Sequence, residues 1–167
     1  MVTAPDSKTH LYNTTVRWTG NRGEGTETYR SYDRDHDIVS PGRPTLRGTS
    51  DTAFNGDPSR WNPELLLLAS VSECHMLWFL QLASMRGVVV NGYEDAAEGR
   101  MAEEHDGGRF VDVLLRPTVT VTDASMAEIA QRLHEEASTR CFIANSLNFE
   151  VRHEPRTRVA GQPSHSQ

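Results

Sequence analysis

The chain has 167 residues, of which 23 are acidic and 17 basic, and its formal net charge is −6. This length suits one domain with a core of its own. The acidic balance and the lack of a basic cluster argue against a nucleic acid as the main partner. Two cysteines do not make a disulfide framework, and the N-terminus lacks the charged and apolar pattern of a secretory signal. We therefore expect a cytoplasmic protein whose thiols are kept reduced.

The first third of the chain predicts short strands. Residues 1–9 are polar and are expected to form a mobile N-terminus. Alternation over residues 10–19 predicts a half-buried strand, and three glycines in residues 20–25 predict a hairpin into a second strand at about residues 26–33. Two further short strands and a loop are expected at residues 36–39, 45–49 and 50–61.

The longest apolar run predicts a central helix with a signal at each end. Asn62 can cap it, Pro63 suits its first turn, and Gly87 can end it in a left-handed conformation. A helix of this length, about 36 Å, could cross a small domain or a bilayer. Glu73 and His75 lie in its middle, where charge is costly in lipid, so we predict no membrane span. A helix that is apolar all round needs covering, which a second copy of the chain would supply.

The remaining chain predicts strands on either side of a second helix. Strands are expected at residues 88–104, 109–115, 118–122 and 148–153, with a hairpin turn at 105–108. Asp123 can cap the second helix, whose apolar stripe consists of Met126, Ile129, Ala130, Leu133 and Ala137. The order of elements predicts an α+β fold with antiparallel sheets and two main helices. We expect a single domain at residues 10–155 and a disordered tail at residues 156–167.

The two cysteines, Cys74 and Cys141, are the candidate reactive groups. They are 67 positions apart, without the spacing of a metal site or of a Cys-x-x-Cys redox motif. Free cysteine is most often a small buried residue of the core. Because a predicted helix carries Cys74 and another leads up to Cys141, the two sulfurs could also meet as a reactive pair. Both interpretations are open at this point.

Three separate motifs resemble one known family. They are Arg22-Gly23-Glu24-Gly25-Thr26, Asn62-Pro63-Glu64-Leu65-Leu66-Leu67 ahead of Cys74, and Cys141-Phe142-Ile143-Ala144-Asn145-Ser146. In this order they are similar to the osmotically inducible protein C and organic hydroperoxide resistance (OsmC/Ohr) family, in its OsmC-like peroxiredoxin branch. The likeness extends from Leu11 to Pro155. It implies an α+β OsmC-like fold whose long central helix is buried in an intertwined homodimer.

The resemblance also implies a chemistry. The protein would be a thiol-dependent peroxidase that reduces organic hydroperoxides, with Cys74 as the peroxidatic and Cys141 as the resolving cysteine. Arg22 and Glu64 would be the pair that activates the thiol, because only a thiolate is a good nucleophile and a nearby cation favours it. A Cys74–Cys141 disulfide would then be reduced by an external dithiol, which the family suggests is of the lipoyl type. No cofactor and no metal are expected.

Helix geometry restricts how Glu64 can reach Cys74. Ten residues on one straight helix correspond to a rise of about 15 Å and leave the two side chains about 80° apart. Either the helix breaks between them or Glu64 reaches Cys74 of a second chain. We predict the second arrangement, since two antiparallel helices would also cover each other's apolar faces.

Several features leave alternatives open. Arg30 and Arg34 are rival cations to Arg22. Glu73 would weaken the nucleophile if it pointed into the site, and His75 suits a core histidine better than a general base. The apolar residues Phe54, Met76, Trp78 and Phe79 could line a pocket or simply pack in the core.

Two other functions fit the same residues. One is a dimeric protein of the same fold that binds a small molecule without redox chemistry. The other is a protein in which Cys74 attacks other electrophiles and Cys141 is structural.

Overall fold

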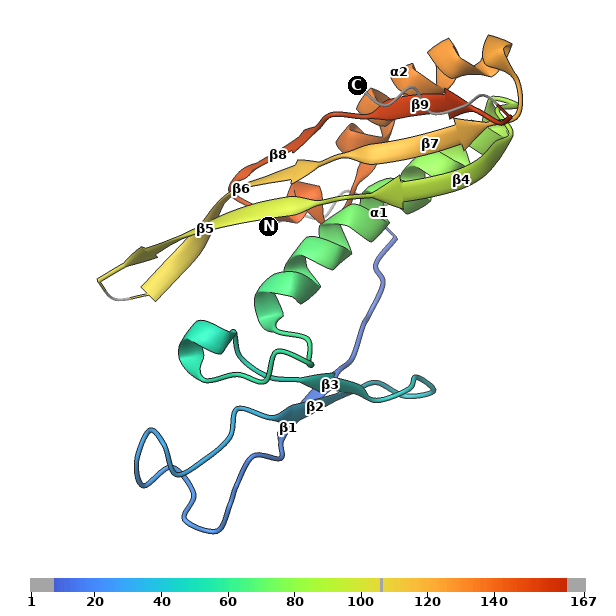
Figure 1. The fold of residues 1–167 in the computed structure, drawn as a ribbon. Coiled ribbons are helices and arrows are strands. Elements are labelled where there is room, and N and C mark those ends of the chain that lie inside the picture. Colours follow the sequence, from blue (N-terminus) through green and yellow to red (C-terminus); the bar gives the residue numbers. More distant parts are fainter. Residues whose placement is uncertain (1–7, 106, 162–167) are drawn as a thin grey trace. The chain divides into compact units, whose positions relative to one another are not determined.

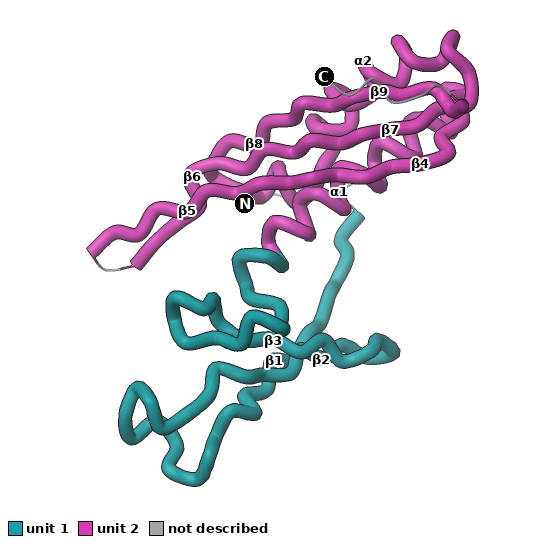
Figure 2. The backbone as a smooth tube through the Cα atoms, viewed as in Figure 1, with its two compact units in different colours: residues 1–66 teal, residues 67–167 magenta. Residues whose placement is uncertain are grey.

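The computed structural model describes residues 8–105 and 107–161 (Figure 1). The chain divides into two compact units, residues 1–66 and 67–167, which are described separately (Figure 2). The single domain expected at residues 10–155 stays a prediction. Residues 1–7 of the expected mobile N-terminus and residues 162–167 of the expected tail lie outside the described residues.

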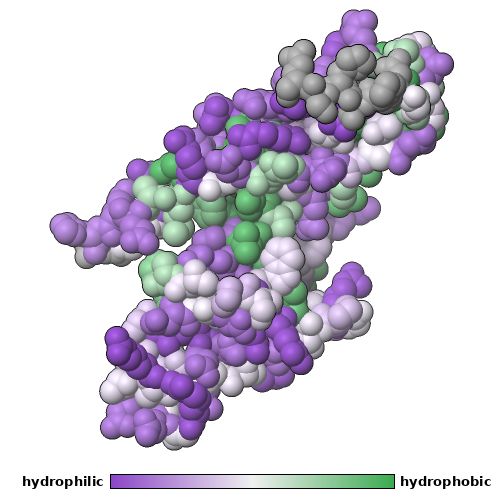
Figure 3. All heavy atoms as spheres, in the orientation of Figure 1, coloured by the Kyte–Doolittle hydropathy of each residue, from purple (hydrophilic) through white to green (hydrophobic). Residues whose placement is uncertain are grey.

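Unit 1 contains one small antiparallel sheet. Its strands are β1 (Thr15–Trp18), β2 (His36–Val39) and β3 (Leu46–Gly48), with β2 in the middle. The side chains of the buried hydrophobic core, among the described residues, all belong to unit 2. In agreement with this, the visible surface of unit 1 is mainly hydrophilic (Figure 3).

The second strand predicted at residues 26–33 is wrong. These residues form turns and bends, apart from a single bridge between Asn21 and Tyr32. The side chain of Asn21 accepts hydrogen bonds from the backbone N–H groups of Gly23 and Gly25, and Ser31 Oγ bonds the backbone of Thr28. The loop therefore satisfies its backbone groups locally, and β2 pairs with β1 in place of the expected strand.

Helix α1 (Pro63–Met85) begins and ends at the predicted signals. Before it, a short 3-10 turn, η1 (Thr52–Phe54), is capped by Asp51. Asn62 Oδ1 accepts from the N–H of Leu65 at 2.8 Å, as expected of an N-cap. At the other end Gly87 has a φ of +70°, and the N–H of Val88 donates to the carbonyl of Ala83 at 2.9 Å. Both ends are satisfied by the residues predicted from the sequence.

Unit 2 contains two three-stranded sheets and helix α2. The elements that follow α1 are β4 (Val90–Asp95), β5 (Glu98–Glu104), β6 (Gly107–Leu115), β7 (Pro117–Val121), η2 (Ala124–Met126), α2 (Ala127–Arg140), η3 (Ala144–Ser146), β8 (Glu150–His153) and β9 (Arg156–Val159). The strand orders are β4-β7-β9 and β5-β6-β8. Only one or two residues separate β4 from β5, β6 from β7 and β8 from β9, so the two sheets continue each other end to end (Figure 1).

The prediction of antiparallel sheets is correct for β4–β7 and β5–β6 and wrong for the other two strand pairs of unit 2. Strand β8 pairs with β6 in parallel, and β9 pairs with β7 in parallel. Parallel neighbours need a long connection between them, and α2 provides it. The α+β class and the two main helices are as predicted.

Part of the tail predicted to be disordered forms a strand. Residues 156–159 are β9, whose register with β7 runs from Thr118 opposite Arg156 to Val121 opposite Val159. Thr157 and Val159 are half-buried, whereas Arg156 and Arg158 are exposed. This alternation is short and largely polar, so its signal for a strand is weak.

One stripe of α1 forms the core with the sheets and α2. Its buried side chains are those of Val71, His75, Phe79, Leu82 and Ala83. They pack with Val119 and Val121 of β7, with Val113 and Leu115 of β6, and with Ala130, Leu133 and Ala137 of α2. The opposite side of α1 is not covered, because Leu77 is 60% and Met85 70% exposed.

By length and composition alone α1 could cross a membrane. Its buried stripe instead serves as the core of unit 2, as in a soluble protein.

A pair of histidines joins α1 to α2 inside this core. His75 Nε2 and His134 Nδ1 are 3.0 Å apart, within hydrogen-bonding distance, and the two rings are nearly parallel with 5.3 Å between their centroids. Phe79 stacks on His134 with 4.2 Å between the ring centroids, and the ring centroid of His153 in β8 lies 5.5 Å from that of His75. Burial, with a smaller contribution from the neighbouring histidines, lowers the pKa of His75 to about 4 and that of His134 to about 3.

We expect acid to destabilise the fold between pH 6.5 and about 4. The unfolded chain binds protons on His75 and His134 below pH 6.5, whereas the folded chain does so only near their lowered pKa values, so stability is complete above pH 6.5 and is lost as the pH falls. The loss should approach about 1.4 kcal/mol per pH unit for each histidine. Urea unfolding at several pH values between 4.5 and 7 measures it.

The controls use one buried and one exposed histidine. His134→Gln should flatten the pH dependence, whereas His105→Gln, at an exposed position, should leave it unchanged. Equal slopes in the two variants would contradict the assignment.

Candidate thiol site

Cys74 and Cys141 meet in unit 2. Cys74 lies in the middle of α1 and is half-buried, whereas Cys141 follows the last residue of α2 and is only 1% exposed. The thiol of Cys74 lies close enough to that of Cys141 to help raise the pKa of Cys141, and both thiols are free. The packing of the two helices on one core, described above, produces this contact.

The surroundings of Cys141 keep its thiol protonated. Burial raises the pKa of Cys141 to about 11. The contact with Cys74 contributes to this rise, while the backbone N–H of Ala144, which points at Cys141 Sγ from 3.4 Å, acts in the opposite direction. The two sulfurs therefore differ in access, since only Cys74 is partly open to solvent.

An aromatic pair and one cation flank the two thiols. Trp78 lies one helical turn after Cys74 and meets Phe142, the residue after Cys141, edge to face at 5.5 Å. The guanidinium of Arg140 lies 5.7 Å from the centre of the Trp78 ring. Phe142 and Arg140 were missed as site residues in the sequence, although each adjoins Cys141.

The other residues proposed for an apolar pocket are Phe54, Met76 and Phe79. Phe79 is fully buried in the core against His134, so it cannot line an open pocket. Met76 is half-buried on α1, and Phe54 belongs to η1 in unit 1.

The two residues that flank Cys74 on α1 differ in burial. Glu73 is exposed, whereas His75 is a core histidine.

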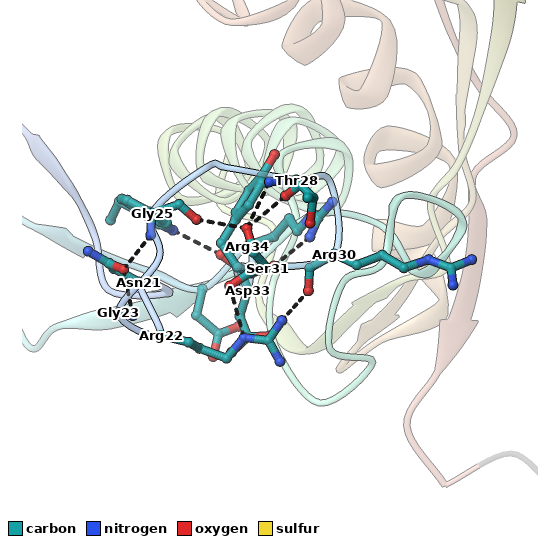
Figure 4. Close-up of polar contacts among 12 residues, drawn as sticks. Asn21, Arg22, Gly23, Gly25, Thr28, Arg30, Ser31, Asp33 and Arg34 are labelled. Carbon is teal, nitrogen blue, oxygen red and sulfur yellow. Dashed lines mark hydrogen bonds and ion pairs between the residues drawn. The ribbon is translucent and has the colours of Figure 1, made fainter.

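Arg22 is held by the loop in which it lies (Figure 4). Its guanidinium donates to the backbone carbonyls of Ser31, at 3.3 Å, and Arg30, and it forms an ion pair with Asp33 at 3.8 Å. Gly23 follows with a φ of +117°, a conformation that favours glycine. The loop thus orients Arg22 while leaving its side chain 53% exposed.

The two rival arginines differ from Arg22. Arg34 lies over the rings of Tyr29 and Tyr32, at 4.1 and 4.3 Å from their centroids, and donates to both backbone carbonyls. These contacts give Arg34 a structural role within the loop. The side chain of Arg30 points away from the other labelled residues (Figure 4).

Glu64 lies in the first turn of α1. One of its carboxylate oxygens, Oε2, is buried and has no hydrogen-bond partner among the described residues. Helix α1 is continuous from Pro63 to Met85, so no break in the helix brings Glu64 to Cys74. Arg22 and Glu64 belong to unit 1 and the two cysteines to unit 2, and their meeting in one site stays a prediction.

Metal ligands do not cluster in the part of the chain that the structure describes. There, no group of three or more histidine, cysteine, aspartate or glutamate side chains has the arrangement of a metal site.

Comparisons with known proteins agree on one family. An OsmC-like protein of unknown function from Vibrio cholerae matches with a TM-score of 0.78 and 28% identity, over 88% of this chain and 99% of the other. An organic hydroperoxide resistance protein from Elizabethkingia anophelis matches with a TM-score of 0.63 and 17% identity, over 90% and 98% of the two chains.

A third solved structure is the organic hydroperoxide resistance protein OhrB of Bacillus subtilis, with a TM-score of 0.57 and 16% identity over 89% and 98%. No curated protein matches the sequence. The family model of OsmC-like proteins matches residues 56–156, which include α1 and both cysteines. The chain therefore belongs to the OsmC-like protein family.

Proposed function

We propose that this protein is a thiol peroxidase that reduces organic hydroperoxides to alcohols in defence against oxidative stress. The contact between half-buried Cys74 and buried Cys141 carries the proposal. The membership in the OsmC-like family supports it, as do the organic hydroperoxide resistance proteins among the structures of similar fold.

The first step is an attack of the Cys74 thiolate on the terminal oxygen of the hydroperoxide. The O–O bond breaks, an alkoxide leaves and takes up a proton as the alcohol, and Cys74 becomes a sulfenic acid. Cys74 is the sulfur for this step because it is the one that a substrate can reach. The thiol of Cys141 stays protonated until the sulfenic acid of Cys74 has formed.

The second step closes the disulfide. Cys141 loses its proton and attacks the sulfur of the sulfenic acid, which releases water as the Cys74–Cys141 bond forms. A dithiol from outside, of the lipoyl type, then takes the place of Cys141 in a mixed disulfide and leaves as its own disulfide, which returns both thiols. Such a cycle suits the reducing cytoplasm.

Arg22 and Glu64 are proposed to complete the site. Arg22 would stabilise the thiolate, and Glu64 would hold the guanidinium in a two-pronged pair. The unpartnered Oε2 of Glu64 supports this role, because a buried carboxylate oxygen needs a donor.

A homodimer is proposed to bring these residues together. Leu77 and Met85 on α1 and Val16 on β1 are all more than half exposed in the single chain. Such apolar surface is typical of an interface. In a dimer with antiparallel α1 helices, each Glu64 reaches the Cys74 of the partner.

The first prediction concerns the thiols. One equivalent of an alkyl hydroperoxide should lower the mass of the wild-type protein by about two daltons, the loss of two hydrogens on forming a disulfide. Cys74→Ser should show no such loss. Mass spectrometry with a count of free thiols measures both. Two intact thiols under excess peroxide would favour the dimeric small-molecule binding protein.

The second prediction concerns the resolving cysteine. Cys141→Ser should reduce one equivalent of hydroperoxide and stop with Cys74 as a sulfenic acid, which only excess hydroperoxide oxidises further to the sulfinic acid. Full hydroperoxide turnover with an external dithiol in Cys141→Ser would show that Cys141 is structural and is not the resolving cysteine.

The third prediction concerns the partner's carboxylate. Glu64→Ala and Cys74→Ser should each lose most of the peroxidase activity. A mixed dimer of the two variants keeps one site in which Glu64 of one chain serves Cys74 of the other, so co-expression should restore up to about half of the wild-type rate per dimer. A mixed dimer as inactive as its parents would contradict the action of Glu64 across the interface.

A further inference from the structure

The C-terminal ends of α1 and α2 bring two arginines and one glutamate together. Glu136 of α2 accepts from Arg140 at 2.8 Å and from Arg86, which follows α1, at 3.2 Å. Two guanidinium groups thus share one carboxylate, and the cluster keeps a net charge of +1 in a chain of net charge −6. The cluster is accessible, because Arg140 and Arg86 are 48% and 58% exposed.

This cationic cluster is adjacent to the thiols. Arg140 directly precedes Cys141, and its guanidinium lies 5.7 Å from the centre of the Trp78 ring, one turn along α1 from Cys74. Trp78 in turn supports Phe142, which is 68% exposed. Beside the two sulfurs the protein therefore presents an apolar aromatic surface with a positive charge at its edge.

An arginine held in this way is prepared to bind an anion. Glu136 and the Trp78 ring restrict the Arg140 side chain, which lowers the entropy lost when a ligand binds. Neither contact consumes all five of its N–H donors, and guanidinium groups bind carboxylates in a two-pronged geometry.

We propose that Arg140 selects hydroperoxides that carry a carboxylate. The apolar part of such a substrate lies on Trp78 and Phe142, its carboxylate pairs with Arg140, and its hydroperoxide group faces Cys74. The inference rests on the proposed peroxidase function and adds to it a residue that determines specificity.

The alternative is that Arg140 only stabilises the end of α2. An arginine in the last turn of a helix, paired with a glutamate four residues earlier, does this in many proteins. Arg132 offers a matched control, because it forms the same type of pair with Glu128 on the same helix. A purely structural role predicts the same result for the two arginines.

The test compares an acid with its neutral ester. Initial rates with linoleic acid hydroperoxide and with its methyl ester, in one detergent and with one dithiol, give kcat/KM for each. We expect wild type to prefer the acid by about tenfold, which corresponds to about 1.4 kcal/mol, and to lose this preference at high salt. Arg140→Gln should remove the preference by slowing the acid alone, and Arg132→Gln should keep it.

The outcomes separate this inference from the function on which it rests. Equal reduction of acid and ester by wild type, or an unchanged preference in Arg140→Gln, would overturn the role of Arg140 and leave the peroxidase in place. Reduction of neither substrate by wild type would overturn the proposed peroxidase and the selectivity with it. Equal losses for acid and ester in Arg140→Gln would show a structural role.

Discussion

The packing of α1 against α2 in the core of unit 2 positions the two thiols. Its centre is the hydrogen-bonded pair of His75 and His134, with Phe79 stacked on His134. His75 lies on α1 beside Cys74, and His134 lies on α2, which ends just before Cys141. A fixed contact between the helices therefore sets the distance between Cys74 and Cys141. The neutral form of both imidazoles is a requirement of this packing, since a charge at that depth would be costly.

The same packing makes the two cysteines unequal. Cys141 ends α2 in the interior, where burial keeps its thiol protonated, and Cys74 lies on the flank of α1 beside the buried stripe. Two thiols that react one after the other need this kind of asymmetry, because one sulfur must be accessible to the substrate and the other must react only with the sulfenic acid that the first step forms. Two equally buried thiols would suit packing alone.

The uncovered surfaces of the chain give the proposed dimer a physical reason. Residues 8–66 of unit 1 contribute nothing to the buried hydrophobic core, and one side of α1 is exposed. Large apolar side chains on that side are exposed among residues 8–105 and 107–161, and a second copy of the chain is the simplest cover for them. The buried and unpartnered oxygen of Glu64 adds a polar group that also lacks a partner among the described residues.

The sequence alone determined the elements whose signals are local. Asn62, Pro63 and Gly87 mark the ends of α1, and the apolar stripe of α2 marks its buried face, because caps and helical periodicity depend on residues a few positions apart. The motifs around Cys74 and Cys141 are local in the same sense, and they indicate the family without any knowledge of the fold.

Tertiary structure decided everything that depends on partners distant in the chain. The parallel pairing of β8 and β9 and the strand at residues 156–159 each follow from hydrogen bonds to strands far away in the chain, which no local pattern reveals. The roles of His134 and Arg140 also depend on folding, which places His134 against His75 and Arg140 beside Trp78. A sequence pattern records which face of an element is apolar, and only packing determines what that face meets.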